Sequence, residues 1–383
     1  MVLPAELLTV GYAEPIRRWL RRRFEAVHLV MFERLQFDEV SEQVVLVIAR
    51  GSGGCNAFSL LPVEDASDLS SLRLFGPNHF SVTPANAGKW SDLFLSVEQR
   101  QLFERAVDQC VPLAKYGAPE LGTVTGANSF FALSESTRLK FGLTEKQLVR
   151  ISPPGTKHLR GLAFTRSDWE RMRNADEPVW LLRPKPSDRT KALRRYLELG
   201  AKEGVPDGYK CSIRTPWWRP PVVPAPDLFF TYMSHLYPRL IRNSAHVSFL
   251  NSMHGICLNE DAPRAAAAAL PLLCLNSVTM LGAEIYGRSY GGGVLKMEPR
   301  EAAVLPVPAP TGLARAFDGL KQEQRNLERH LRAGRWTSVV KRVDEVLLQG
   351  VFGLSSKETL AIREAAVDLR GRRMRKRAGP NAT

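Results

Sequence analysis

The residues with the greatest capacity for chemistry in this sequence lie in polar loops, and the first of these loops is Gly122–Asn128. It contains Thr125 and Asn128 and is followed at once by Phe130 and Phe131. Glycine and asparagine adopt positive φ at low cost, so the sequence predicts a tight turn that enters a strand, with the two phenylalanines fixing its base in a core. Such a turn presents N–H groups and short side chains to a ligand. An ordinary hairpin turn fits these residues equally well.

Two further loops have the same character. Asn251, Ser252 and His254 form a polar turn between apolar segments. An asparagine amide can bridge an adenine edge with two hydrogen bonds, and a histidine could donate to a phosphate; a structural role in the turn is the alternative for both. In residues 288–296, three glycines permit close backbone approach, and the flanking cations favour a phosphate as the approaching group. The candidate contacts in this third loop are Arg288, Tyr290 and Lys296.

Residues 209–221 interleave cations with aromatic rings, a mixture that suits a nucleic-acid surface. Phosphate contacts need lysine and arginine, while base recognition needs forked or amide side chains. The candidates in this segment are Lys210, Arg214, Trp217 and Arg219. For Trp217 a packing role is an equally good interpretation, because large aromatic rings usually contribute buried area.

Composition points to the same kind of partner. The chain has 383 residues and a net charge of +14, a surplus that predicts a polyanionic partner, either nucleic acid or an acidic membrane surface. No uninterrupted apolar run is long enough to span a bilayer, so nucleic acid is favoured and no membrane partner is expected. Five scattered cysteines without a Cys-x-x-Cys pair favour a cytoplasmic protein without disulfides or structural zinc. No acid–base pair, nucleophile or metal cluster stands out, so we predict no catalytic, cofactor-binding or metal-binding residues here.

The first fifty residues read as part of a sheet-and-helix domain. The pattern predicts a helix over Tyr12–Phe24, with an apolar face that consists of Ile16, Trp19 and Leu20. The five arginines between 17 and 23 are expected to form its solvated face, with phosphate contact as the alternative. Two β-branched runs, at 27–32 and 44–49, predict strands buried on both faces, as in an α/β sheet.

The remaining chain alternates short elements and ends in helices. A helix is predicted over 97–110 with Ser96 as its N-cap, and Ser167 is expected to cap another. Residues 264–287 favour one helix kinked at Pro271. Residues 312–379 predict a small helical bundle, and the dense basic run at 370–377 is typical of a disordered, non-specific tail.

Four motifs occur in a recognisable order. They are Gly122–Phe131, Tyr209–Pro221, Leu250–Ile256 and Gly287–Pro299, the last followed by Leu305-Pro306-Val307-Pro308. Over residues 1–310 this series resembles the C-terminal target-recognition half of γ-class adenine-N6 DNA methyltransferases of bacterial restriction–modification systems. The family's S-adenosylmethionine loop and its Asn-Pro-Pro-Tyr/Phe motif are absent. Gly51–Gly54 lacks the pattern of the first, and Ser152-Pro153-Pro154-Gly155 lacks the amide and the aromatic ring of the second.

The resemblance implies an α+β architecture in four parts. These are a partial, Rossmann-like α/β methyltransferase fragment (1–50), a connector with a helix (51–112), a mixed DNA target-recognition domain (113–310) and a helical segment with a basic tail (311–383). It also implies that S-adenosylmethionine binds a missing half, which a separate catalytic chain could supply. A non-catalytic DNA specificity subunit and an inactive truncated methyltransferase are the alternatives. Two strands and a helix alone would leave an unpaired sheet edge, which favours completion by another polypeptide or a truncated frame.

Overall fold

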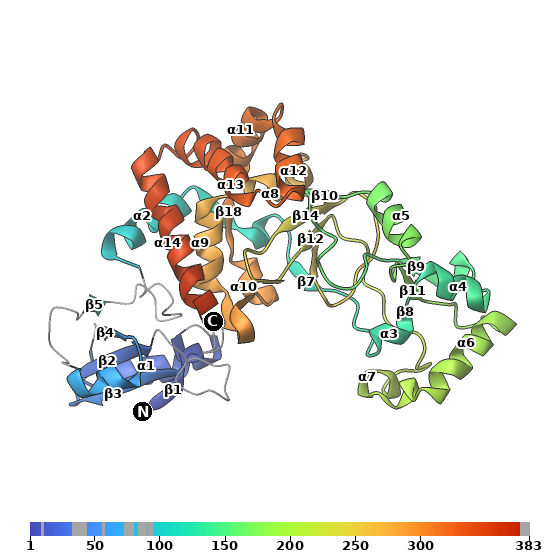
Figure 1. Cartoon of the computed structure of the whole chain (residues 1–383), viewed down its shortest axis with the longest axis horizontal. Coiled ribbons are helices and arrows are strands. Elements are labelled where there is room, and N and C mark those ends of the chain that lie inside the picture. The colour runs from blue at the N-terminus through green and yellow to red at the C-terminus, as the bar shows by residue number, and fades with distance from the viewer. Residues whose placement is uncertain are drawn as a thin grey trace.

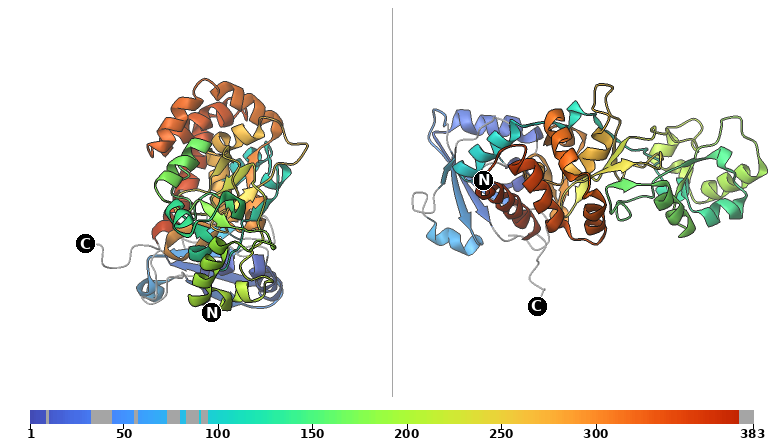
Figure 2. Two further views of the ribbon diagram at one scale, coloured as in Figure 1. Left: turned by 90° about the vertical axis from the view of Figure 1, so that its right-hand side faces the viewer. Right: turned by 90° about the horizontal axis from the view of Figure 1, so that it is seen from above.

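The computed structural model describes residues 1–8, 11–32, 44–55, 58–72, 80–82, 90 and 95–375. It is a mixed α+β structure with several small sheets, and it is elongated (Figures 1 and 2). Seen from above, an N-terminal sheet lies at one end, a helical body lies in the middle and a smaller distal lobe lies at the other end (Figure 2). The predicted α+β class is confirmed, whereas the four-part division remains a prediction.

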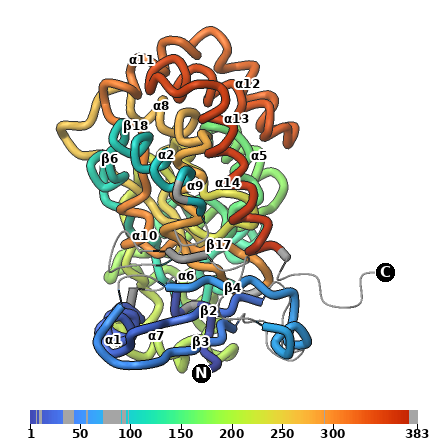
Figure 3. The backbone as a smooth tube through the Cα atoms, turned by 90° about the vertical axis from the view of Figure 1, so that its left-hand side faces the viewer, coloured from blue at the N-terminus to red at the C-terminus, as the bar shows by residue number. Residues whose placement is uncertain are grey.

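The N-terminal part is one five-stranded sheet that lies beneath the helical body (Figure 3). Its strands in spatial order are β1 (Val2–Pro4), β3 (Val44–Arg50), β2 (Ala26–Phe32), β4 (Phe58–Val63) and β5 (Phe80–Val82). Only β2 and β4 pair in parallel; the other neighbours are antiparallel. Strand β2 is buried on both faces as predicted, while β3 alternates buried and half-exposed residues. Parts of the connector predicted at 51–112 lie outside the described residues, but β4 and β5 extend the predicted two-stranded fragment.

Helix α1 (Glu14–Arg23) lies within the predicted range, but only Leu20 of the predicted apolar face is buried. Leu20 and Arg17 are fully buried against the sheet, whereas Ile16 and Trp19 are half exposed. The Arg17 guanidinium donates to the Leu7 carbonyl at 2.6 Å, and burial lowers its pKa. The prediction that all five arginines form the solvated face is therefore wrong for Arg17, because its side chain is buried and donates to a backbone carbonyl inside the fold.

The distal lobe is organised around a three-stranded sheet with short helices at its edges (Figure 1). Its strands are β8 (Ala132–Leu133), β11 (Trp180–Leu182) and β9 (Leu148–Arg150). Its helices are α3 (Asn128–Phe131), α4 (Glu135–Phe141), α5 (Arg166–Asn174), α6 (Lys191–Lys202) and α7 (Tyr209–Ser212). Thr165 rather than Ser167 caps α5, since its hydroxyl accepts the Asp168 amide in a capping box.

A second five-stranded sheet joins the distal lobe to the helical body. Its strands in order are β10 (Ala163–Phe164), β14 (Leu240–Asn243), β12 (Leu228–Phe230), β15 (His254–Ile256) and β7 (Pro119–Leu121). One face contributes Phe229 and Ile241 to the core of the distal lobe, and the other contributes Leu228 and Phe230 to the core of the body. The sheet therefore couples the two parts through a shared buried layer.

The helical body packs around one continuous core. Its long elements are α2 (Val97–Val107), α8 (Ala266–Leu273), α9 (Ser277–Tyr286), α11 (Pro310–Leu320), α12 (Gln324–Arg332), α13 (Trp336–Asp344) and α14 (Ser356–Arg375). The shorter ones are β6 (Cys110–Pro112), β13 (Met233–Ser234), β16 (Arg288–Tyr290), β17 (Val294–Lys296), α10 (Pro299–Ala303) and β18 (Pro306–Pro308). The predicted Ser96 cap and terminal helices are confirmed, although α2 ends at Val107.

Two predictions for the body need correction. Residues 264–287 form two helices bent by 80°, and the break falls at Cys274–Asn276, where Asn276 caps α9, instead of at Pro271. The basic run is helical as far as Arg375, and Arg373 is buried within the fold; residues 376–383 lie outside the described residues. Within the described chain, no single helix is long and apolar enough to cross a membrane, and the bent pair α8–α9 meets that test only when both helices are joined.

Candidate nucleic-acid interface

The first predicted loop is held in shape by Arg214. Its guanidinium donates to the carbonyls of Thr125 and Val124 at 2.5 and 2.6 Å, across 89 and 90 residues of chain. Thr125 is fully buried, and its hydroxyl donates to the Asn128 side chain at 2.5 Å. A helical turn, α3, separates this loop from the strand that was expected to follow it directly. Phe130 and Phe131, also in α3, are buried as predicted, so the loop stands on a rigid base.

The 209–221 segment runs beside that loop, and its residues have different surroundings. Lys210 is exposed, and its Cβ lies so near Gly126 that a Cβ added to this glycine would meet it at 2.6 Å. Trp217 packs against Phe130 with a ring separation of 5.7 Å, which supports the packing interpretation. Arg219 donates through Nε to the Pro184 carbonyl at 3.2 Å. Of these side chains, Lys210 is the one fully presented to a ligand.

The second loop adjoins the first through the backbone. Thr123 and Leu250 form an isolated parallel bridge, and the Asn251 amide donates to the Thr123 carbonyl at 3.2 Å. Asn251 and Ser252 are half-buried, and Ser252 accepts a hydrogen bond from the Gly155 amide at 2.9 Å.

His254 does not belong to this surface. It is fully buried, its Nε2 lies 3.0 Å from the Met297 carbonyl, and its ring stacks on Tyr232 at 4.2 Å. Burial lowers the pKa of His254, which favours a neutral ring. The histidine is therefore structural, and the predicted phosphate contact is incompatible with its position.

The third loop is a β16–β17 hairpin whose cations are partly neutralised. Arg288 donates to Glu301 at 2.6 and 3.0 Å, and Lys296 lies 2.7 Å from Glu298. Hydrogen bonding to Glu298 raises the pKa of Lys296, and its ammonium lies 5.2 Å from the ring centre of Tyr290. Tyr290 is 54% exposed, so its ring is open to a partner. Gly292 and Gly293 adopt φ values of +70° and +73°, which explains why glycine occupies these positions.

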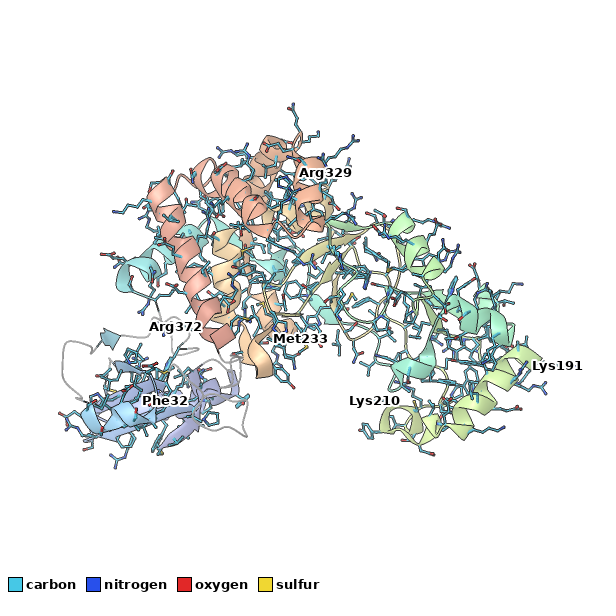
Figure 4. All side chains as sticks on the ribbon, in the orientation of Figure 1. Phe32, Lys191, Lys210, Met233, Arg329 and Arg372 are labelled. Atoms are coloured by element: carbon cyan, nitrogen blue, oxygen red, sulfur yellow. The ribbon has the colours of Figure 1, made fainter. Side chains whose placement is uncertain are left out.

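Tyr232 links the second loop to the third. Its hydroxyl lies 3.4 Å from the Asn251 carbonyl, and its own carbonyl accepts the Met297 amide at 2.8 Å. The three loops thus form one connected series, which we call the three-loop surface: Asn128, Lys210, Asn251, Ser252, Tyr290 and Lys296. Lys210 and Met233, the residue after Tyr232, lie along the edge of the molecule opposite Arg329 (Figure 4). Tyr232 was not singled out from the sequence, because its position in a run of short strands carries no distinguishing pattern.

Neither Gly51–Gly54 nor the segment 152–155 has a structure that suits cofactor binding or the binding of a flipped base. Gly51–Gly54 turns back on α1, since the Cys55 amide donates to the Arg21 carbonyl at 2.8 Å, and the turn enters no helix that could receive a cofactor. Ser152 is fully buried, and its hydroxyl is bound to His158 Nε2 at 2.7 Å, so it offers nothing to a flipped base. Over the described ranges, no group of three His, Cys, Asp or Glu residues could hold a metal ion.

The chain is similar to known methyltransferases. Residues 87–348 match the family described as the C-terminal domain of Type II methyltransferase M.Eco57I, and this match covers more than half of the chain. Type II methyltransferase M.AccI of Acinetobacter calcoaceticus is 22% identical over 310 residues, which are 78% of this chain and 57% of that protein. Type II methyltransferase M.XamI of Xanthomonas campestris pv. amaranthicola is 28% identical over 192 residues, which are 49% of this chain and 34% of that protein.

The aligned part therefore spans about half or less of the length of these relatives. The family match includes all of the three-loop surface, from Asn128 to Lys296. This chain belongs to the family of the C-terminal domain of Type II methyltransferase M.Eco57I.

Proposed function

We propose that this chain binds double-stranded DNA and recognises a target sequence for an adenine-N6 DNA methyltransferase of a restriction–modification system. The observation that carries the proposal is the three-loop surface, in which loops far apart in sequence are joined by hydrogen bonds into one polar, aromatic and cationic edge. Amides, hydroxyls and forked cations are the groups that read base edges and grip phosphates. The net charge of +14 favours the same polyanionic partner.

In this proposal methyl transfer takes place on a catalytic segment that binds S-adenosylmethionine outside the residues described above. The glycine turn at 51–54 packs on α1, and Ser152 is buried, so the cofactor and the flipped adenine are assigned to that other segment. Isothermal titration of the chain with S-adenosylmethionine tests this assignment directly. We expect no heat of binding, and a stoichiometric heat would place the cofactor site on this chain.

A non-catalytic specificity chain is the second candidate, and the same poor fit of the cofactor segments favours it. The two candidates differ in what a catalytic partner does. A methyltransferase fragment supplied in trans should transfer labelled methyl groups to DNA only when this chain is present. A specificity chain of another system would bind DNA without supporting that transfer.

DNA binding itself is tested by fluorescence anisotropy with a labelled duplex at several salt concentrations. Binding through phosphates releases counterions, so log K should fall linearly with log[salt], with a slope of about −0.9 per phosphate contacted. Lys210→Ala should weaken binding and flatten the slope, whereas Arg329→Ala, on the opposite edge, should change neither (Figure 4). Absent binding, or binding insensitive to salt, would contradict the proposal.

A further inference from the structure

Two arginines lie together at the end of β11, outside the three-loop surface. Arg183 directly follows Leu182, the last residue of that strand. Arg219 reaches it from the segment after α7, because its Nε donates to the carbonyl of Pro184, the residue next to Arg183, at 3.2 Å. The positive charge of Arg219 and burial both lower the pKa of Arg183, burial being the larger cause. The hydrogen bond to Pro184 therefore places the positive charge of Arg219 beside the residue that directly follows Arg183.

Neither arginine has an acidic partner in the described chain. Arg183 is half-buried, and its Nη1 is fully enclosed without any hydrogen-bond acceptor. Two carboxylates of the same lobe already have other partners: Glu135 binds Arg138 at 2.6 Å, and Asp188 accepts from Gln147 at 3.0 Å. Other arginines of the lobe, by contrast, form ion pairs with nearby carboxylates, as in Arg166–Glu170 and Arg150–Glu145.

This arrangement is costly for the empty protein. A buried donor without an acceptor costs about 1–3 kcal/mol, and like charges held together add to that cost. An oxyanion bound by the remaining donors of Arg183 and by the guanidinium of Arg219 would offset the repulsion between the two charges, because the guanidinium fork matches the oxygens of a phosphate.

We propose that Arg183 and Arg219 form a binding subsite for an oxyanion, and that a DNA backbone phosphate occupies it. The inference rests on the proposed function. The 209–223 segment supports this source of phosphate, because it carries Lys210, Arg214 and Arg219 and then donates from the Val223 amide to the Thr123 hydroxyl at 3.0 Å. The subsite is thus built on the same segment that borders the three-loop surface. Trp217, packed on Phe130, anchors this segment between Arg214 and Arg219.

The full chain tests the subsite through Arg183→Met, Arg219→Met and the double variant, with Arg329→Met as the matched control. Methionine keeps the apolar stem and removes the charge. Each variant should bind duplex DNA about tenfold more weakly, since a charge-assisted contact is lost. Each single variant should also reduce the slope of log K against log[salt] by about 0.9. The double variant should reduce that slope by no more than the same amount, because both arginines contact one phosphate. The control should keep the wild-type slope.

Thermal stability without DNA separates a binding role from a packing role. Arg183→Met should raise Tm, because it removes an unsatisfied charge, whereas a packing arginine would lower Tm on removal. Inorganic phosphate, compared with chloride at equal ionic strength, should raise the Tm of the wild type and leave the double variant unchanged. A lower Tm for Arg183→Met, together with no phosphate effect on the wild type, would overturn the subsite.

The outcomes also separate this inference from the proposed function. If the wild type fails to bind duplex DNA, the proposed function falls, while the phosphate effect on Tm still decides whether an oxyanion site exists. If the wild type binds DNA and all three variants match Arg329→Met in affinity and slope, the DNA-phosphate subsite is overturned. A phosphate effect on Tm in that second case would identify a free anion as the occupant.

Discussion

At the scale of single residues, the cations near the candidate interface divide into structural and available groups. Arg214 is a structural one, because its guanidinium is held by the carbonyls of Val124 and Thr125. Lys210, four residues earlier in the chain, is exposed and has no ion pair within the described residues. The role of a lysine or arginine here therefore depends on whether its N–H donors already have acceptors within the protein.

For Arg214 we predict an effect that passes through the loop. Arg214→Ala should destabilise the fold by about 1.5–3 kcal/mol, because two charge-assisted hydrogen bonds are lost. Arg214→Lys should restore little of it, since one ammonium does not reproduce the fork that binds two carbonyls. Urea unfolding measures this cost, and hydrogen exchange of residues 122–128 should accelerate in both variants. If residues 122–128 of Arg214→Ala exchange hydrogen at the wild-type rate, Arg214 does not position this loop.

His158 is a second residue whose charge state the fold controls. Its Nε2 lies 2.7 Å from the hydroxyl of the buried Ser152. Burial lowers its pKa to about 4, while the nearby Asp168 raises it and Arg239 lowers it. The ring is therefore neutral in the folded protein at pH 7, although a histidine in an unfolded chain has a pKa of about 6.5.

This difference predicts a loss of stability in acid. As the pH falls below 6.5, His158 becomes protonated in the unfolded chain, whereas in the folded chain it stays neutral down to about pH 4. The resulting loss between pH 8 and pH 5 is on the order of 2 kcal/mol and ceases below pH 4. His158→Gln keeps a polar partner for Ser152 without a titrating group, so its unfolding free energy should fall less over this range. Parallel pH profiles for both proteins would refute the assignment.

At the scale of elements, helix α14 fixes the third loop. Arg373, near the end of α14, is 4% exposed and pairs at 2.7 Å with Glu284 of α9, which is 3% exposed. The same guanidinium donates to the carbonyl of Gly293. Residues after 348 lie beyond the family match, so this helix contacts the third loop from outside the matched range.

Removing Arg373 should therefore be costly. Arg373→Met leaves the buried Glu284 carboxylate without its partner, and breaking such a pair costs about 3–5 kcal/mol. The double variant Arg373→Met/Glu284→Met should recover much of that loss, because no buried charge remains. Chemical denaturation measures both values. A single variant as stable as the wild type would show that the pair contributes nothing to the folded state.

Helix α1 illustrates what the sequence could and could not predict. Its presence follows from Pro15 and from the apolar spacing and is confirmed, although α1 begins at Glu14 and ends at Arg23, inside the predicted range Tyr12–Phe24. Its orientation is wrong because the prediction assigned every arginine to solvent, whereas the face that packs contains Ala13, Arg17 and Leu20. Tertiary structure brings the Leu7 carbonyl, one acceptor for Arg17, to the buried guanidinium, and a one-dimensional pattern carries no such information.

The interface shows the same division. Loop composition identified the three loops, and the structure brings them together through Thr123, Asn251 and Tyr232. Composition could not separate Lys210 from Arg214, nor foresee that His254 is buried, because these distinctions depend on contacts between residues far apart in the chain. Arg183 follows an apolar strand and carried no signal at all; its unsatisfied donor is visible only in three dimensions.

At the scale of the whole molecule, the candidate interface occupies one edge. The ends of α3 and α7 lie along the lower edge in Figure 1, whereas α11, α12 and α13 lie along the upper edge. The molecule therefore offers an internal comparison, since both sets of helices have exposed lysines: Lys210 belongs to α7, Lys341 belongs to α13, and Lys321 directly follows α11. A non-specific attraction to DNA would involve both sets, whereas a dedicated surface would involve only the first.

Lysine footprinting of the wild-type chain makes this comparison most directly. The protein is modified with an amine-reactive reagent with and without duplex DNA, and each lysine is quantified by mass spectrometry. We predict that DNA protects Lys210 and Lys296 and leaves Lys321 and Lys341 as reactive as in the free protein. Equal protection of all four, or protection of Lys321 and Lys341 alone, would contradict the assignment of the three-loop surface to DNA.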